Sequence, residues 1–201
     1  MLEAIFYSLS GFFMKLSDDS YDQEDNKTLA IIFGVICGLT IGYLVVTSAD
    51  AAYIFLGIFI GTLLSKKIDG IHHIITALVF LSIALIFGIP SMGIGTLVIC
   101  ALAAYIDEIG NDNTAISKRS KFFGLFFKYR FTLKLVILVL SLFGLIQIFH
   151  PNFKIIGIEF MQYYTIIYFI LFELFYEIAG LKFDAVYNRL SRLSRVLGLI
   201  N

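Results

Sequence analysis

Hydrophobic residues are gathered into seven long runs that short polar stretches separate. The runs cover residues 2–16, 29–46, 51–64, 74–89, 92–106, 131–149 and 155–181. Runs this apolar predict helices that cross a membrane, and a crossing takes roughly 20 residues. Several runs hold only about 14 to 16 residues, so we expect their helices to extend into the polar flanks or to tilt in a thinned bilayer. The pattern therefore predicts an all-α, polytopic transmembrane helical bundle of about seven helices over residues 1–181.

The composition supports the membrane interpretation. Of the 201 residues, 59% are hydrophobic and 15% are charged, and the mean hydropathy is +0.91. A soluble core of this size could not bury so much apolar surface. The formal net charge is zero, which gives no reason to expect nucleic-acid binding. We therefore expect an integral membrane protein whose first partner is membrane lipid.

The basic residues are divided unevenly between the two sides of the predicted bundle. If the N-terminus lies outside, the stretches 15–28, 65–73 and 107–130 and the tail 182–201 are cytoplasmic. Together with Lys134 they hold fourteen of the fifteen Lys and Arg residues. Cytoplasmic loops carry such an excess of basic residues. We therefore predict a multi-pass protein of the cell membrane with its N-terminus outside and its C-terminus in the cytoplasm.

The tail 182–201 is predicted to be a separate cytoplasmic amphipathic segment. Its apolar and basic side chains alternate: Leu190, Leu193 and Val196 with Arg189, Arg192 and Arg195. This pattern indicates a helix that lies at the membrane surface and contacts anionic headgroups. A non-catalytic membrane scaffold could use such a tail, so that class stays open.

Glycines recur every four residues in the second and third runs. They are Gly34, Gly38 and Gly42, followed by Gly57 and Gly61. Small residues at this spacing let helix backbones approach closely inside a membrane. We interpret them as packing positions.

The first acidic cluster follows the first apolar run. It comprises Asp18, Asp19, Asp22, Glu24 and Asp25, five of the fifteen acids within eight residues. If the first helix continues past Ser17, then Asp18, Asp22 and Asp25 share one face and offer the hard oxygen ligands that Mg²⁺ or Ca²⁺ prefers. The alternative is a solvated acidic loop.

The second acidic cluster comprises Asp107, Glu108 and Asp112, at the end of the fifth run. Glu108 and Asp112 form an i, i+4 pair, although Gly110 is expected to break the helix between them. Both clusters follow helices that run from outside to inside, so they are predicted to lie at one membrane face. The candidate metal ligands are therefore Asp18, Asp19, Asp22, Asp25, Asp107, Glu108 and Asp112. Ordinary polar loops are the alternative.

Basic residues follow at the same predicted face. Those that could bind a diphosphate are Lys66, Lys67, Lys118, Arg119, Lys128 and Arg130. Arg binds phosphate through a bidentate fork and Lys acts as a point charge, but anchoring of the membrane face alone would also explain most of them. Asp69, His72 and His73 have a spacing that could ligate a metal, or they form an interfacial cap.

The two clusters resemble the aspartate-rich motifs of the UbiA family of intramembrane prenyltransferases. The resemblance rests on residues 18–22 (DDSYD) and 105–112 (YIDEIGND). It implies a prenyltransferase-like enzyme that uses Mg²⁺ and an isoprenoid diphosphate, with Asp22 and Asp112 as catalytic residues. Asp18 stands where the family usually has asparagine, and the family usually has nine helices.

A transporter of ions or small solutes is the competing interpretation. Glu173 and Glu177 lie one turn apart in the seventh apolar run. Carboxylates inside a membrane are candidates for relaying protons or binding cations. The two interpretations differ in the residues on which activity would depend.

Overall fold

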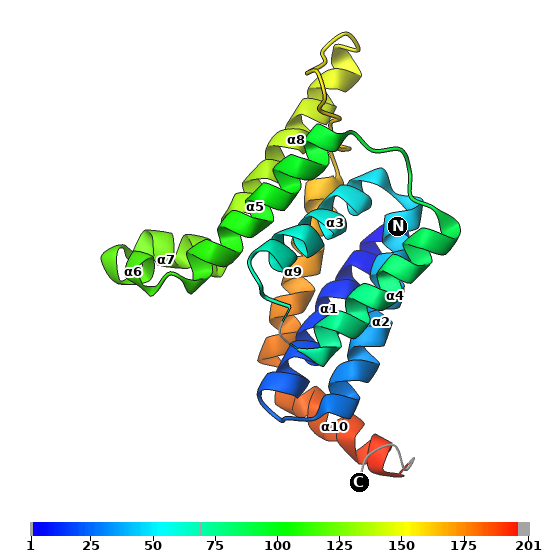
Figure 1. Ribbon diagram of the computed structural model, residues 1–201, viewed down its shortest axis with the longest axis vertical. Helices are drawn as coiled ribbons and strands as arrows, with labels where there is room; N and C mark the ends of the chain where they lie inside the picture. Colours follow the sequence, from blue (N-terminus) through cyan, green and yellow to red (C-terminus); the bar gives the residue numbers. More distant parts are fainter. Residues whose placement is uncertain (1, 69, 197–201) are drawn as a thin grey trace. The chain divides into compact units, whose positions relative to one another are not determined.

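The computed structural model describes residues 2–68 and 70–196, and the described chain is all-α, as predicted (Figure 1). Its helices are α1 (Leu2–Asp22), α2 (Lys27–Thr47), α3 (Ala49–Leu64), α4 (Ile71–Phe87), α5 (Ile94–Asp112), α6 (Thr114–Arg119), α7 (Lys121–Lys128), α8 (Phe131–Phe149), α9 (Thr165–Leu181) and α10 (Phe183–Val196). Each of the seven apolar runs contains one helix. The shorter helices α6 and α7 occupy the polar stretch after α5, and α10 occupies the tail.

Three of the described helices, α2, α5 and α8, are long and apolar enough to cross a membrane. The helices α3 and α4 are apolar but shorter, with 16 and 17 residues. These lengths are consistent with the predicted membrane protein.

The chain forms two compact units, each built from separate segments. Among the described residues, the first unit comprises 2–44, 70–88 and 168–196, and the second comprises 45–68 and 89–167. The first unit therefore holds α1, α4, α10 and most of α2 and α9. The second holds α3, α5, α6, α7 and α8.

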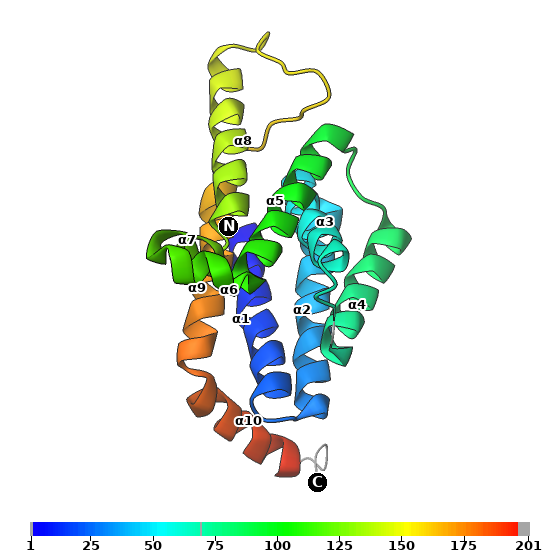
Figure 2. The same ribbon diagram turned by 60° about the vertical axis from the view of Figure 1, so that its left-hand side comes forward.

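The glycines of α2 bring it against α4 in the first unit, and Figures 1 and 2 both show these helices side by side. A Cβ added at Gly38 would lie 2.8 Å from the carbonyl oxygen of Thr76, and one at Gly42 would lie 2.5 Å from Ile83 Cδ1. The predicted packing role of these glycines is confirmed.

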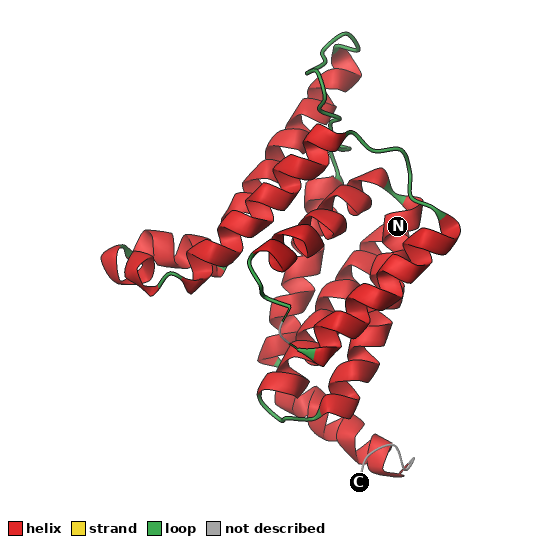
Figure 3. Ribbon diagram, in the orientation of Figure 1, coloured by secondary structure: helices red, strands yellow, loops and turns green. Residues whose placement is uncertain are grey.

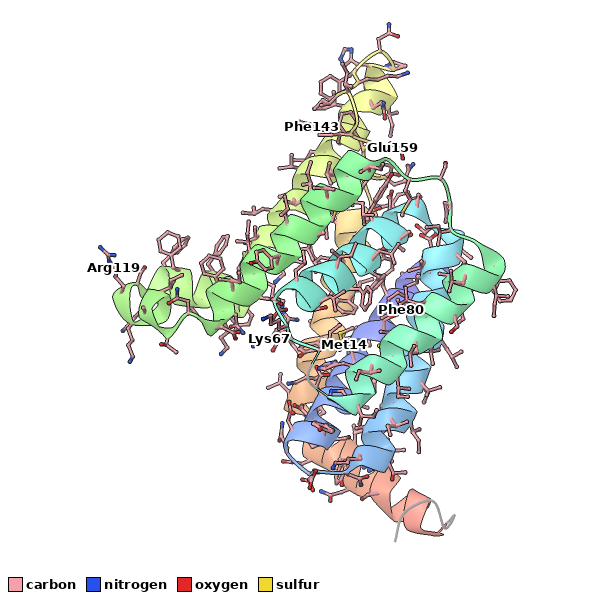
Figure 4. The ribbon with its side chains drawn as sticks, in the orientation of Figure 1. Met14, Lys67, Phe80, Arg119, Phe143 and Glu159 are labelled. Atoms are coloured by element: carbon pink, nitrogen blue, oxygen red, sulfur yellow. The ribbon has the colours of Figure 1, made fainter. Side chains whose placement is uncertain are left out.

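The first unit has an apolar core where α1, α2, α9 and α10 meet. Its buried members are Leu16, Leu29, Phe33, Ala179 and Phe183. Figure 4 labels Met14 on α1 and Phe80 on α4, which belong to the same unit. This packing fixes the last turns of α1, where the first acidic cluster begins.

In the second unit, α5 packs against α3 on one side and against α8 on another. A Cβ added at Gly57 would lie 2.8 Å from Cys100 Cβ, and one at Gly61 would lie 2.7 Å from Ala104 Cβ. The close approach predicted for this pair of glycines is confirmed as well.

The predicted helix break at Gly110 is wrong, because α5 continues through it to Asp112. A Cβ at Gly110 would lie 2.2 Å from Phe127 Cδ1 of α7. The glycine thus makes room for an aromatic ring and does not end the helix.

The seventh apolar run is helical only from Thr165, and a loop precedes it (Figure 3). Polar contacts hold this loop: the Tyr53 hydroxyl donates to Glu159 Oε2 at 2.5 Å, and Thr96 Oγ1 donates to the Glu159 carbonyl at 2.8 Å. Gly157 adopts a φ of 78° in the same stretch. Apolar composition alone therefore did not separate loop from helix.

Candidate metal site

The first acidic cluster is divided by the end of α1. The helix continues past Ser17, as the metal interpretation required, and it ends at Asp22. Beyond it, Asp25 has a left-handed backbone with φ 46°, and the Asn26 N–H donates to the Ser20 carbonyl at 2.8 Å. The prediction that Asp25 shares a helix face with Asp18 is therefore wrong, because the chain turns before reaching it.

Asp18 lies next to the two histidines that begin α4. Its Oδ1 is 3.4 Å from His72 Nε2 and 3.9 Å from His73 Nδ1. One potential ligand atom from each of the three residues lies within 4.8 Å of the others. A carboxylate and two imidazoles are a donor set found at transition-metal sites. We call these three residues the Asp18 cluster.

His72 is held in a closed environment. The residue is only 2% exposed, and its ring packs in a tilted arrangement against those of Tyr21 and His73 at centroid distances of 4.6 and 4.0 Å. Neither ring nitrogen makes a hydrogen bond with any described residue. A Cβ at Gly70 would lie 2.3 Å from His72 Cε1, so the glycine gives this ring its space.

Other polar groups hold the second oxygen of Asp18 and its neighbour. The Tyr176 hydroxyl of α9 donates to Asp18 Oδ2 at 3.1 Å. Asp19 is buried, and its Oδ1 lies 2.9 Å from Lys15 Nζ, which in turn lies 5.3 Å from the centre of the Tyr176 ring. Asp22 is exposed. The acids of α1 thus have different environments although they are neighbours in sequence.

The second acidic cluster belongs to the second unit, and its carboxylates have protein partners. Asp107 accepts hydrogen bonds from the Thr132 and Leu133 N–H groups at 3.0 and 2.8 Å. Glu108 lies 2.9 Å from Arg130 Nη2. Asp112 is paired with Lys67 at 2.5 Å and its side chain remains 50% exposed.

The six basic residues predicted to bind diphosphate also lie in the second unit. Lys67 and Arg130 are the two that pair with the second acidic cluster. Lys128 lies 5.5 Å from the centre of the Tyr129 ring. Arg119 projects from the far end of α6 (Figure 4). Lys66 is exposed in the loop after α3, and Lys118 lies in the last turn of α6.

Sequence reasoning found the histidines but assigned them another carboxylate. Asp69, their predicted co-ligand, lies outside the described residues. The carboxylate beside the histidines is instead that of Asp18, which lies on a different helix and 54 positions before His72. The signal available in the sequence was the pair of adjacent histidines at the start of an apolar run. The carboxylate beside them could not be identified from the sequence, because it depends on tertiary packing. The two glutamates of the transporter interpretation lie on α9, where Glu177 is exposed and Glu173 is partly buried.

The fold and the site define an all-helical protein with helices of membrane-spanning length and a cluster of one carboxylate and two histidines. No family model matches the chain, and no curated protein or solved structure shows significant similarity to it. Its function is therefore argued from the residues.

Proposed function

We propose that this chain is a multi-pass protein of the cell membrane that acts as a prenyltransferase-like enzyme on an isoprenoid diphosphate with Mg²⁺. The proposal includes the N-terminus outside and the C-terminus in the cytoplasm. It rests on the uneven distribution of basic residues and on one feature of the second unit, an apolar groove that ends beside a group of charged side chains.

The groove lies between α5 and α8 and measures about 310 Å³. Its lining includes Ile99, Leu135, Val139 and Phe143, and Ile158 of the following loop; Phe143 is labelled in Figure 4. The volume is at the lower end of the roughly 300–1,000 Å³ of small-molecule sites. An apolar hydrocarbon chain fits this lining.

The charged end of the groove begins at Thr132. Thr132 lines the groove, and its N–H donates to Asp107. Glu108 and Asp112 follow Asp107 on α5, and they form ion pairs with Arg130 and Lys67, respectively. An amphiphile with an apolar tail and an anionic head matches this order of apolar and charged residues.

The carboxylates of this group differ in what they could do. Asp107 is 1% exposed and uses both oxygens on backbone N–H groups, so we assign it to structure. Asp112 is accessible, and carboxylate oxygens are ligands that Mg²⁺ takes together with substrate phosphates. When bound, the ion would offset charge that develops on the leaving diphosphate. Lys67 and Arg130 would add positive charge at the same end.

Asp22 keeps the role that the family resemblance gives it. Its carboxylate is exposed at the end of α1, where it is open to a cation. Asp22 and Asp112 are therefore tested by separate substitutions.

Binding of a non-hydrolysable prenyl diphosphate analogue to the purified protein, with and without Mg²⁺, tests the proposal. We expect Mg²⁺-dependent binding that Asp112→Asn and Lys67→Met each weaken at least tenfold, because the first change removes a carboxylate that would hold Mg²⁺ and the second removes a positive charge that would face the diphosphate. Asp22→Asn tests the first cluster in the same way. Asp184→Asn changes an exposed acid of α10 and serves as the matched control. Unchanged affinity in all three test variants would overturn the proposal.

A further inference from the structure

We propose that Asp18, His72 and His73 bind a transition-metal ion of the Zn²⁺ type, at a site separate from any Mg²⁺ used with a diphosphate. The site lies wholly in the first unit. It does not depend on the prenyltransferase proposal, whose groove and adjoining charged residues lie in the second unit.

The distances suit a shared ion better than direct hydrogen bonds. Two ligand atoms at 2.0–2.1 Å from a tetrahedral Zn²⁺ lie about 3.3 Å apart. The separation of Asp18 Oδ1 from His72 Nε2 is 3.4 Å, and that from His73 Nδ1 is 3.9 Å. Hydrogen bonds between nitrogen and oxygen are usually about 2.7–3.2 Å long. Small side-chain adjustments would therefore bring the three donors to one ion.

Burial supplies an independent reason to expect a ligand. His72 is 2% exposed, and within the described part of the chain its two nitrogens and Asp18 Oδ1 have no hydrogen-bond partner. Buried polar atoms in native proteins are nearly always satisfied. A cation between Nε2 and Oδ1 would give both atoms a partner at once.

Without a cation, two imidazoles face one carboxylate oxygen. Asp18 Oδ1 lies 3.4 Å from His72 Nε2 and 3.9 Å from His73 Nδ1, both beyond the usual hydrogen-bond length of about 2.7–3.2 Å, and the centroids of the two rings are 4.0 Å apart. A divalent ion instead accepts lone pairs from two neutral imidazoles, so the proximity of the rings becomes favourable.

The surroundings position the donors. Tyr176 donates to Asp18 Oδ2 and so leaves Oδ1 directed to the histidines. Outer hydrogen bonds of this kind orient metal ligands, and their loss typically lowers metal affinity 10–100-fold. Tyr21 packs on the His72 ring, and Gly70 leaves room for it.

The donor set indicates the class of ion. Imidazoles suit Zn²⁺ and neighbouring transition metals, whereas Mg²⁺ prefers an all-oxygen shell. Three protein ligands leave one position of a tetrahedral ion for water or another exchangeable ligand, as in catalytic zinc sites. The site is therefore suited to chemistry at the ion as well as to holding α1 against α4.

Direct metal binding tests the inference. Purified protein in detergent would be stripped with a chelator and loaded with Zn²⁺ or Co²⁺, without any diphosphate. We expect about one ion per chain by elemental analysis and visible absorption typical of tetrahedral Co²⁺. Asp18→Asn, His72→Gln and His73→Gln should each weaken Zn²⁺ binding at least tenfold in competition with a chelating dye.

Two variants separate loss of a ligand from loss of the fold. Tyr176→Phe keeps the ring and removes one hydroxyl, so we expect 10–100-fold weaker Zn²⁺ binding with the helical content unchanged. His150→Gln changes an exposed histidine outside the site and should leave binding intact. The inference is overturned if wild-type protein holds no Zn²⁺ or Co²⁺ more tightly than the His72→Gln variant, or if Tyr176→Phe and all three ligand variants bind normally. Asp22→Asn and Asp112→Asn should keep the ion, so failure of this site and failure of the prenyltransferase proposal are distinguishable.

Discussion

Replacing Asp107 should destabilise the protein, because this residue caps a helix that has no cap of its own. Arg130 stands at the N-cap position of α8 with φ 50°, and its side chain pairs with Glu108 instead of capping the helix. Asp107 of α5 accepts from the Thr132 and Leu133 N–H groups in the first turn of α8. The first turn of an α-helix has N–H groups without intrahelical partners, and here a neighbouring helix satisfies two of them.

The magnitude follows from those two bonds. Hydrogen bonds to charged groups contribute about 1.5–3 kcal/mol each, and a negative charge at a helix N-terminus adds about 0.3–1 kcal/mol. Asp107→Ala removes both bonds in a site where the residue is 1% exposed, so we expect a loss of about 4 kcal/mol. Asp107→Asn keeps one acceptor and should lose about 2 kcal/mol.

Unfolding in mixed detergent micelles, followed by circular dichroism, measures these losses. Asp184→Ala is the control, because that acid is exposed and a surface change should stay within about 0.5 kcal/mol. The capping argument fails if Asp107→Ala also stays within that range. If that variant stays stable but loses Mg²⁺-dependent diphosphate binding, Asp107 is a metal ligand, as the sequence had suggested.

Two further predictions concern the glycines between helices. Gly38→Leu should destabilise the first unit by about 3 kcal/mol or more, since a Cβ added there would lie 2.8 Å from the Thr76 carbonyl oxygen and the rest of the leucine would need further room. Leu39→Ala, at a position that is 52% exposed, should cost far less in the same unfolding assay. Gly110→Ala should destabilise the protein despite alanine's better helix propensity of about 1 kcal/mol, because its Cβ would meet Phe127. Adding Phe127→Ala should relieve that clash, and a double-mutant cycle with no coupling between the two would contradict this explanation.

The helices could be predicted from the sequence because they depend on local pattern. Each apolar run contains a helix, and the four-residue glycine spacing indicated where α2 and α3 meet other helices. The errors occurred where distant contacts decide the local structure. Gly110 stays helical because Phe127 fills its open side, and residues 155–164 form a loop held by polar contacts such as that of Glu159 with Tyr53.

The candidate sites were less predictable than the fold. The acids of both clusters were conspicuous in the sequence, but the contacts of Asp18 and Asp107 are with residues far away in the chain. Asp107 turned out to serve the start of α8, 25 positions later. Asp18 lies beside His72 rather than on a shared face with Asp25. Sequence spacing describes which residues share a helix face, whereas these contacts depend on how one helix packs against another.

The discontinuous first unit has a consequence for how the protein is made. Its segments are separated in the chain by those of the second unit, and Tyr176 follows Asp18 by 158 positions. At about 5–20 residues per second, the ribosome delivers the tyrosine roughly 8–30 s after the aspartate. Within that interval α2 and α4 are synthesised before α9 and α10, so Asp18 and the histidines are both made before the hydroxyl group that donates to Asp18. The first unit to begin synthesis is thus the last to be completed.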